Sequence, residues 1–188
     1  IEKEKTDNPY YLHGPVCRKG QNMYLSHSDG TPFYWFGDTW LMGLTKRLPF
    51  PDDFCTLLND RKEKGFNVIQ IIAGLYPDMT MFDPRGENEA GFPWKEDLSA
   101  INPEYFDRAD ERIEKLVENG IMPCIVGTWG FYMFFAGKEI LKKHWRYIIA
   151  RWGAMPVCWC VAGEADMPFY NHNVPYEEHI KKAKKDWN

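Results

Sequence analysis

The sequence has no long apolar run and no strong excess of charge of either sign. Its 188 residues carry a net charge of -4, and no stretch approaches the roughly eighteen consecutive apolar residues that a membrane span needs. The N-terminal segment 1–11 is charged and does not resemble a signal peptide. A mildly acidic surface offers no electrostatic reason to bind nucleic acid or an anionic membrane. We therefore expect neither nucleic acid nor membrane as a partner.

Several motifs that carry common chemistries are also missing. The five cysteines form an odd set without a CxxC pair, which favours free thiols over disulfides or a metal site. The five histidines show no HxH or HExxH spacing. The absence of a GxSxG turn argues against a serine hydrolase, and the absence of a glycine-rich phosphate loop argues against nucleotide binding. We expect the protein to use neither a metal nor a cofactor.

The sequence does contain a repeated alternation of apolar runs and amphipathic stretches. Buried parallel strands are unbroken apolar runs. The first two stretches between them begin at Pro or Asn, and all three stretches end at Gly, as helices do. The predicted strands span 34–38, 68–74, 121–130 and 157–164, and the predicted helices span 52–65, 102–120, 137–153 and 175–187. A short hairpin precedes them, so we divide the chain into an N-terminal extension with a β-hairpin, residues 1–32, and a βα domain, residues 33–188.

Four strand-helix units in a row predict an α/β fold with a parallel sheet and right-handed crossovers. A doubly wound open sheet usually carries a glycine-rich phosphate turn after its first strand, and the segment here, GDTWLMGL, lacks that spacing. A (β/α)8 barrel needs about 250 residues, so four units are half of one. We therefore predict the first four βα units of a (β/α)8 barrel of the TIM type. The long segment 75–102 is a candidate for building a binding site.

Acidic and aromatic side chains gather where the predicted strands end. Glu164 directly follows an apolar run, and the carboxyl ends of parallel strands are where α/β folds keep their chemistry. Sugar rings stack their C–H faces on aromatic side chains, and sugar hydroxyl groups need carboxylate or amide acceptors. The pattern predicts a carbohydrate site at the strand ends, and this site includes Glu164. Its expected substrate-binding residues are Asp38, Trp40, Gln70, Trp129, Tyr132 and Asp166.

Each of these residues also has a purely structural interpretation. Glu164 could end its strand by pairing with a nearby cation, and Asp38 could cap a helix or support a hairpin. Trp40 and Trp129 could fill the core instead of holding a sugar. Gln70 lies in mid-strand, where an amide that faces a barrel interior is costly unless it is paired, which favours a role in orienting the site.

Five segments resemble a known family. FYWFGDTW, RKEKGFNVIQ, INPEYFDRADERIEKLVENGI, PCIVGTWG and the AGE at 162–164 look like the N-terminal half of the apiosidase-like glycoside hydrolases, over about residues 15–170. The resemblance implies a TIM-barrel glycosidase of the large retaining clan, of a kind often found in bacteria that degrade plant polysaccharides. It further implies an oligosaccharide or polysaccharide substrate and a secreted or periplasmic location. It assigns the general acid/base to Glu164, where many relatives carry Asp.

The resemblance also implies a part of the site that the pattern does not supply. Such enzymes place a second catalytic carboxylate after a later strand, near the seventh, whereas four units are present here. Glycosidases need their two carboxyl groups about 5 to 9.5 Å apart on opposite faces of the sugar, which Asp166, two residues from Glu164, cannot easily achieve. Asp38 suits a hydroxyl acceptor better. We expect the half-barrel to pair with a second copy or to belong to a longer polypeptide with a C-terminal half. The alternative function is a carbohydrate-binding half-barrel without catalysis.

Overall fold

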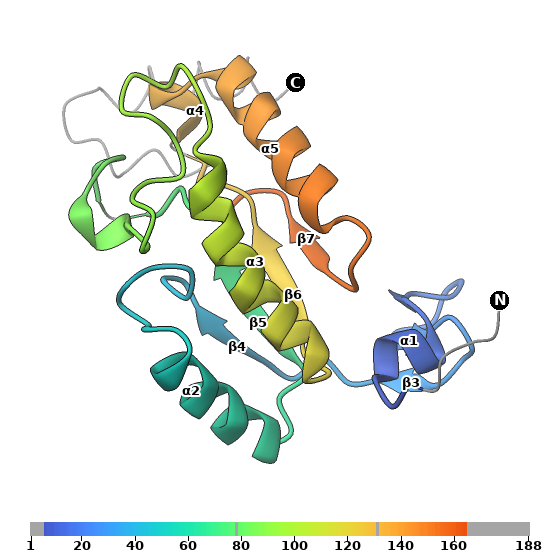
Figure 1. Ribbon diagram of the computed structural model, residues 1–188. Coiled ribbons are helices and arrows are strands. Elements are labelled where there is room, and N and C mark those ends of the chain that lie inside the picture. Colours follow the sequence, from blue (N-terminus) through green and yellow to red (C-terminus); the bar gives the residue numbers. More distant parts are fainter. Residues whose placement is uncertain (1–5, 78, 131, 165–188) are drawn as a thin grey trace, which may run out of the picture.

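The computed structural model describes residues 6–77, 79–130 and 132–164 and contains a four-stranded parallel sheet (Figure 1). The strands lie side by side in chain order: β4 (Gly37–Trp40), β5 (Val68–Ile72), β6 (Met122–Val126) and β7 (Cys158–Cys160). Each of the three adjacent pairs is parallel. The four predicted strands are thus confirmed, although the first is shifted to Gly37–Trp40 and the other three end two to four residues earlier than predicted.

Three long helices connect these strands and pack on one face of the sheet (Figure 1). They are α2 (Asp52–Glu63), α3 (Pro103–Glu118) and α5 (Lys138–Trp152), and two short helices, η1 (Pro84–Gly86) and α4 (Tyr132–Phe135), lie in the connections. The start of α3 has Pro at a position where the missing N–H costs no hydrogen bond. A doubly wound sheet would carry helices on both faces, whereas a barrel keeps them all outside. The fold is therefore the predicted first half of a (β/α)8 barrel.

The main core lies between the sheet and these helices. Ile69, Ile71 and Ile125 point from the strands towards the helices, and all three side chains are fully buried. Phe106 of α3 and Trp152 of α5 meet them from the helix side. Because each fully buried aliphatic side chain stabilises the fold by about 1.5–3 kcal/mol, this layer holds the sheet in place under the site.

An N-terminal module covers the opposite, inner face of the sheet at the amino ends of its strands. The module consists of α1 (Pro9–His13), β1 (Val16–Cys17), β2 (Leu25–His27) and β3 (Pro32–Phe33), with the three strands antiparallel. Tyr10 and Phe33 pack on Val68 and Met122. The Tyr10 hydroxyl also donates a hydrogen bond to the Asn67 carbonyl oxygen at 2.7 Å. The module therefore lies at the end of the sheet opposite to the strand ends where the site is expected.

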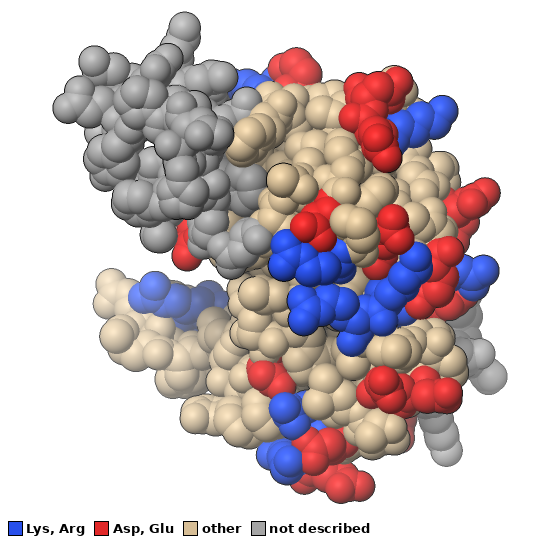
Figure 2. Space-filling model, turned by 90° about the vertical axis from the view of Figure 1, so that its left-hand side faces the viewer, with Lys and Arg blue, Asp and Glu red and all other residues tan. Residues whose placement is uncertain are grey.

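The described surface mixes charges of both signs. Figure 2 shows Lys and Arg side chains beside Asp and Glu side chains on one face of the molecule. The five cysteines are free thiols in the structure, and one of them, Cys124, is buried. Within the described ranges, none of the helices combines the length and the apolar character needed to cross a membrane. The fourth predicted helix, 175–187, lies outside the described residues.

Candidate active site

Glu164 lies four residues beyond β7, past the carboxyl end of the parallel sheet. Its backbone φ is 48°, in the left-handed region that non-glycine residues seldom adopt. The residue is exposed, and its Oε2 accepts a hydrogen bond from the indole Nε1–H of Trp129 at 2.8 Å. Rare backbone conformations persist where the surrounding structure holds them, and they cluster at functional sites. The structure therefore brings together two predicted site residues, Glu164 and Trp129.

Backbone hydrogen bonds join the chain segments that carry these two side chains. The Gly163 N–H donates to the Thr128 carbonyl oxygen at 3.0 Å, and the Gly130 N–H donates to the Gly163 carbonyl oxygen at 2.7 Å. Trp129 and Gly163 thereby form a parallel bridge beyond the ends of β6 and β7. A Cβ atom on Gly163 would lie 2.2 Å from the Trp129 ring, so only glycine allows this close approach. Glu164 thus extends from a fixed frame.

Trp129 is half-buried and anchors the site to the inner face of the sheet. Its ring packs against a cluster of Ile72, Tyr76 and Val126 at the carboxyl ends of β5 and β6. Apolar contacts hold the ring, while its N–H is bonded to Glu164. An anchored indole beside an exposed carboxylate is an arrangement that suits a sugar, whose C–H face stacks on an aromatic ring.

Gln70 also lies on the inner face of the sheet. The register places it in one row with Thr39 and Cys124, which alternates with the row that faces the helices. The Thr39 hydroxyl donates to Gln70 Oε1 at 3.4 Å, and the Gln70 side chain is half-buried. The amide therefore faces the barrel interior with a polar partner, which is the placement expected of an orienting residue.

Asp38 and Trp40 lie on the helix face of the sheet, contrary to the prediction that they hold a sugar. The register pairs Asp38 with Ile69 and Trp40 with Ile71, so both side chains point towards the helices. Trp40 is 6% exposed and packs edge-on against Phe54 in the core. A ring that is covered in this way has no open face for stacking. Trp40 therefore fills the core and does not hold a sugar.

Asp38 forms an ion pair with α2. Its Oδ2 accepts hydrogen bonds from Arg61 Nε and from Trp40 Nε1, and its Oδ1 accepts one from the Thr39 N–H. Partial burial by itself raises the pKa of Asp38, but the hydrogen bonds from Arg61, Trp40 and Thr39 outweigh it and hold the pKa below its ordinary value. Its charge is therefore compensated inside the fold, on the face away from Glu164.

Tyr132 is a core residue, again contrary to the predicted role in sugar binding. It is 1% exposed, and its hydroxyl donates to the Tyr76 carbonyl oxygen at 2.8 Å. Burial raises the pKa of this hydroxyl above its ordinary value. Asp166, the remaining predicted site residue, lies outside the described residues.

Sequence reasoning missed the small residues that shape the site. A Cβ on Gly127, directly after β6, would lie 2.2 Å from the Trp145 ring of α5, just as one on Gly163 would meet Trp129. The available signal was a glycine directly after a buried strand and another directly before the exposed Glu164. Glycines at such places often mark a close approach of side chain and backbone.

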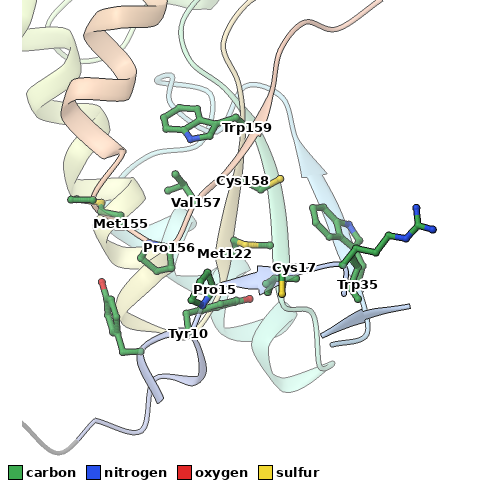
Figure 3. Close-up of a pocket in the computed structure, with 15 residues that line it drawn as sticks. Tyr10, Pro15, Cys17, Trp35, Met122, Met155, Pro156, Val157, Cys158 and Trp159 are labelled. Atoms are coloured by element: carbon green, nitrogen blue, oxygen red, sulfur yellow. The ribbon is translucent and has the colours of Figure 1, made fainter. Parts of the chain in front are cut away.

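Two hollows lie along the edge strands of the sheet. One, of about 670 Å³, is drawn in Figure 3 between the N-terminal module and the chain leading into β7. The other, of about 410 Å³, lies beside β4 at Asp38 and Arg61. No carboxylate is found among the described residues that line the first. In the part of the chain that the structure describes, no group of three His, Cys, Asp or Glu side chains is arranged to hold a metal ion.

Solved glycoside hydrolases share this fold. A protein described as a glycoside hydrolase matches with a TM-score of 0.70 at 22% identity, over 97% of this chain and 40% of its own. A glycoside hydrolase family 5 protein from Bacteroides vulgatus matches with a TM-score of 0.70 at 19% identity, over 99% of this chain and 40% of its own. The chain thus spans about 40% of the length of these structures. The likeness shows the fold, which is half of a barrel of the TIM type.

The family follows from the sequence. The profile of the apiosidase-like catalytic domain matches residues 19–187, which is most of the chain. The protein belongs to this apiosidase-like family, and the resemblance carried by the five segments is confirmed. Among curated proteins, no sequence match is found.

Proposed function

We propose that the protein is a glycoside hydrolase and that Glu164 is its general acid/base. The observation that carries the proposal is an exposed carboxylate just past the fourth strand of an apiosidase-like barrel, bonded to Trp129 at 2.8 Å. A general acid must reach the oxygen atom of the leaving group within hydrogen-bond distance. The exposure of Glu164 and its hydrogen bond to Trp129 support this assignment.

In the proposed reaction, Glu164 donates a proton to the glycosidic oxygen while the bond from that oxygen to the anomeric carbon breaks. The leaving oxygen takes the electron pair of the bond and departs as a hydroxyl group. Water then adds to the anomeric carbon and gives up a proton to Glu164 or to the second carboxylate. The Trp129 N–H orients the carboxylate through Oε2, and the Trp129 ring supports the sugar. Gln70, on the inner face, orients the sugar hydroxyl groups.

The proposed substrates are side chains of plant-type or other complex polysaccharides. Support comes from membership of the apiosidase-like family and from the anchored indole beside the acid. Polymers of this kind do not cross a cell membrane intact, so we place the protein in the periplasm or outside the cell.

The second carboxylate of the reaction is assigned to a part of the barrel outside the described residues. Asp38 does not supply it, because its carboxylate faces the helices and pairs with Arg61. A retaining reaction requires the partner carboxylate about 5 to 5.5 Å from Glu164, and an inverting reaction requires about 6.5 to 9.5 Å. This distance, measured in a longer polypeptide or in an assembly, identifies the stereochemical course.

Replacing Glu164 by Gln tests the acid role. The variant keeps the size of the side chain and its ability to accept the Trp129 hydrogen bond, but it cannot donate a carboxylic proton. We expect turnover of plant oligosaccharides to fall by about 100- to 10,000-fold. Aryl glycosides with acidic phenol leaving groups need less protonation, so their hydrolysis should fall less. Initial rates on both substrate classes measure the difference.

The matched control is Glu139→Gln, which changes an exposed carboxylate on α5 and should leave both rates unchanged. An equal rate for Glu164→Gln and the parent on oligosaccharides would end the assignment. The second candidate function, sugar binding without turnover, is favoured by one observation, namely that Asp38 is unavailable as a second carboxylate. It predicts a change in Trp129 fluorescence on adding oligosaccharide, with no product formed.

A further inference from the structure

A buried histidine lies behind the site and takes no part in the proposed reaction. His144 is in the middle of α5 and is fully buried. Its ring packs beside Phe106 of α3 and Trp94 of the segment 75–102. Burying an imidazole is costly unless both ring nitrogens find partners, and the partners of His144 lead directly to the site.

The two ring nitrogens of His144 have opposite hydrogen-bond roles. Nε2 lies 2.8 Å from the Gly127 carbonyl oxygen, and since a carbonyl oxygen only accepts, Nε2 carries the hydrogen. Nδ1 accepts a hydrogen bond from the Trp94 indole N–H at 3.2 Å. Only the neutral ring with its hydrogen on Nε2 satisfies both contacts. Burial lowers the pKa of His144 to about 4, although the backbone of Gly127 and Ala73 favours the charged ring.

The Gly127 carbonyl is the point where α5 holds the end of β6. Gly127 directly follows β6, and its N–H donates to the Cys160 carbonyl oxygen of β7 at 3.3 Å. Its missing Cβ lets the neighbouring ring of α5, Trp145, pack against the backbone. The chain at this point is thus fixed from the sheet by a backbone bond and from α5 by His144.

The residues after Gly127 connect this fixed point of the backbone to the carboxylate of Glu164. Thr128 is fully buried, and its carbonyl oxygen accepts the Gly163 N–H at 3.0 Å. Trp129 follows, and its indole N–H donates to Glu164 at 2.8 Å. The short stretch from Gly127 to Trp129 therefore links the His144 contact to the hydrogen bond that orients Glu164, and every step along it is a hydrogen bond or a peptide bond.

We infer that His144 is a positioning residue for Glu164, acting through its Nε2 hydrogen bond to the Gly127 carbonyl and the Trp129 indole. The inference rests on the proposed function. The Nδ1 contact has a different role, because it fastens Trp94, and with it the long segment 75–102, to α5. Lys143 lies 5.5 Å above the same Trp94 ring. The imidazole of His144 therefore holds the candidate site through Nε2 and holds the segment 75–102 through Nδ1.

Two amide variants separate the two contacts. In His144→Gln, the amide nitrogen reaches the place of Nε2 and donates to Gly127, while the Trp94 contact is lost. In His144→Asn, the shorter amide lies at the place of Nδ1 and accepts from Trp94, while the Gly127 contact is lost. Each variant gives up one buried hydrogen bond, so a purely structural role predicts equal effects of the two. A positioning role predicts unequal effects.

The first readout is independent of activity. The indole N–H signals of the chain labelled with ¹⁵N-tryptophan are recorded, and the Trp129 signal is identified with Trp129→Phe. We expect the Trp129 signal and its protection from hydrogen exchange to be retained in His144→Gln. In His144→Asn, we expect the signal to shift and its exchange to quicken by about tenfold or more. Equal behaviour of the two variants overturns the inference.

The second readout is the rate on oligosaccharide. His144→Asn should lower kcat by about tenfold or more with little change in KM, since a small misplacement of a reacting group suffices for such a loss. His144→Gln should stay close to the parent. If Glu164→Gln retains activity, the proposed function is refuted. The Trp129 indole N–H signal still tests whether His144 positions Trp129. Activity lost by Glu164→Gln, with Trp129 indifferent to His144→Asn, refutes the inference alone.

A third variant covers the case in which His144→Asn does not fold. Trp94→Phe removes only the donor to Nδ1, and we expect the Trp129 signal to remain in place in it and in His144→Gln. A displaced Trp129 signal in either of these variants would overturn the inference that the hydrogen bond from His144 Nε2 to Gly127 positions Glu164.

Discussion

Gly163 sets the geometry of the site through the side chain it lacks. The Trp129 ring lies against its backbone, at a place where the first carbon of any other side chain would be 2.2 Å from the ring. The same residue forms two backbone hydrogen bonds to the Trp129 segment. Since Glu164 is the next residue, the direction of its side chain depends directly on this contact.

Replacing Gly163 by Ala should push the Trp129 ring away and break its hydrogen bond to Glu164. We expect a loss of roughly 1–3 kcal/mol in the free energy of unfolding, the usual cost of overpacking, together with a lower kcat. Urea unfolding followed by Trp fluorescence measures the first effect, and initial rates on oligosaccharide measure the second. Val161→Ala, at an exposed position in the same segment, should change neither. A Gly163→Ala variant with parental stability would contradict the close packing of Trp129 on Gly163.

The residues of the site were predictable to different degrees, for a physical reason. Glu164 and Trp129 follow long apolar runs, and small errors in the strand ends leave both beyond the sheet. Asp38 belongs to a short strand that was predicted to end at residue 38 but spans Gly37–Trp40. Asp38 therefore lies inside the strand, where alternate residues point to opposite faces. Which face is the inner one is decided by helices that the local sequence does not reveal.

Among the elements, the long segment 75–102 forms hydrogen bonds within itself and to the helices α3 and α5. Asn102, at the N-cap position of α3, makes no side-chain cap and instead donates its side-chain N–H groups to the carbonyl oxygens of Ala90 and Phe92 at 2.9 Å each. Trp94 is 2% exposed and bonds to His144. The pattern indicated a loop of unusual length, but it did not indicate the contact of Trp94 with His144, because these two residues are 50 positions apart in the sequence.

The buried ring of α5 should make stability depend on pH. The pKa of His144 is about 4 in the fold, against an ordinary value near 6.5. As pH falls through 6.5, the unfolded chain takes up a proton that the folded chain refuses until about pH 4, so stability is lost across this window. The loss attributable to His144 amounts to about 3 kcal/mol, and below pH 4 this group adds no further loss.

Urea unfolding at intervals from pH 7 to 4 measures this dependence. His144→Gln has no titrating ring, so its stability should fall less over the same window. Below pH 4 the carboxylates of Asp29 and Asp83, whose pKa values are held at about 2 by hydrogen bonds to Thr31 and Arg85, should dominate in both proteins. Parallel curves between pH 6.5 and 4 would show that His144 is not buried in its neutral form.

At the scale of the whole molecule, both edges of the sheet stand out. Among the described residues, β4 pairs only with β5 and β7 only with β6. One hollow lies beside β7 (Figure 3) and the other lies beside β4. Unpaired strand edges beside apolar surface favour association with a further sheet. We propose that a complementary half-barrel, from a longer polypeptide or from a second copy, covers these edges and completes the site.

Sedimentation velocity of the 22.1 kDa chain tests this proposal. We expect the isolated chain to sediment as a dimer or larger species, with the share of monomer rising on dilution. A chain extended by the remaining βα units should sediment as a monomer. An isolated chain that stays monomeric at all concentrations and hydrolyses oligosaccharide would contradict the need for a second half.

The order of strands and helices, the parallel sheet and the place of Glu164 beyond the fourth strand were determined by the sequence alone, because apolar runs and helix ends are local signals. The roles of Asp38, Trp40 and Tyr132 were decided only by the tertiary structure. Whether a side chain faces helices or the barrel interior depends on register and on packing partners far along the chain. The contact from His144 to Gly127 belongs to the same class, since it exists only once α5 lies against the end of β6.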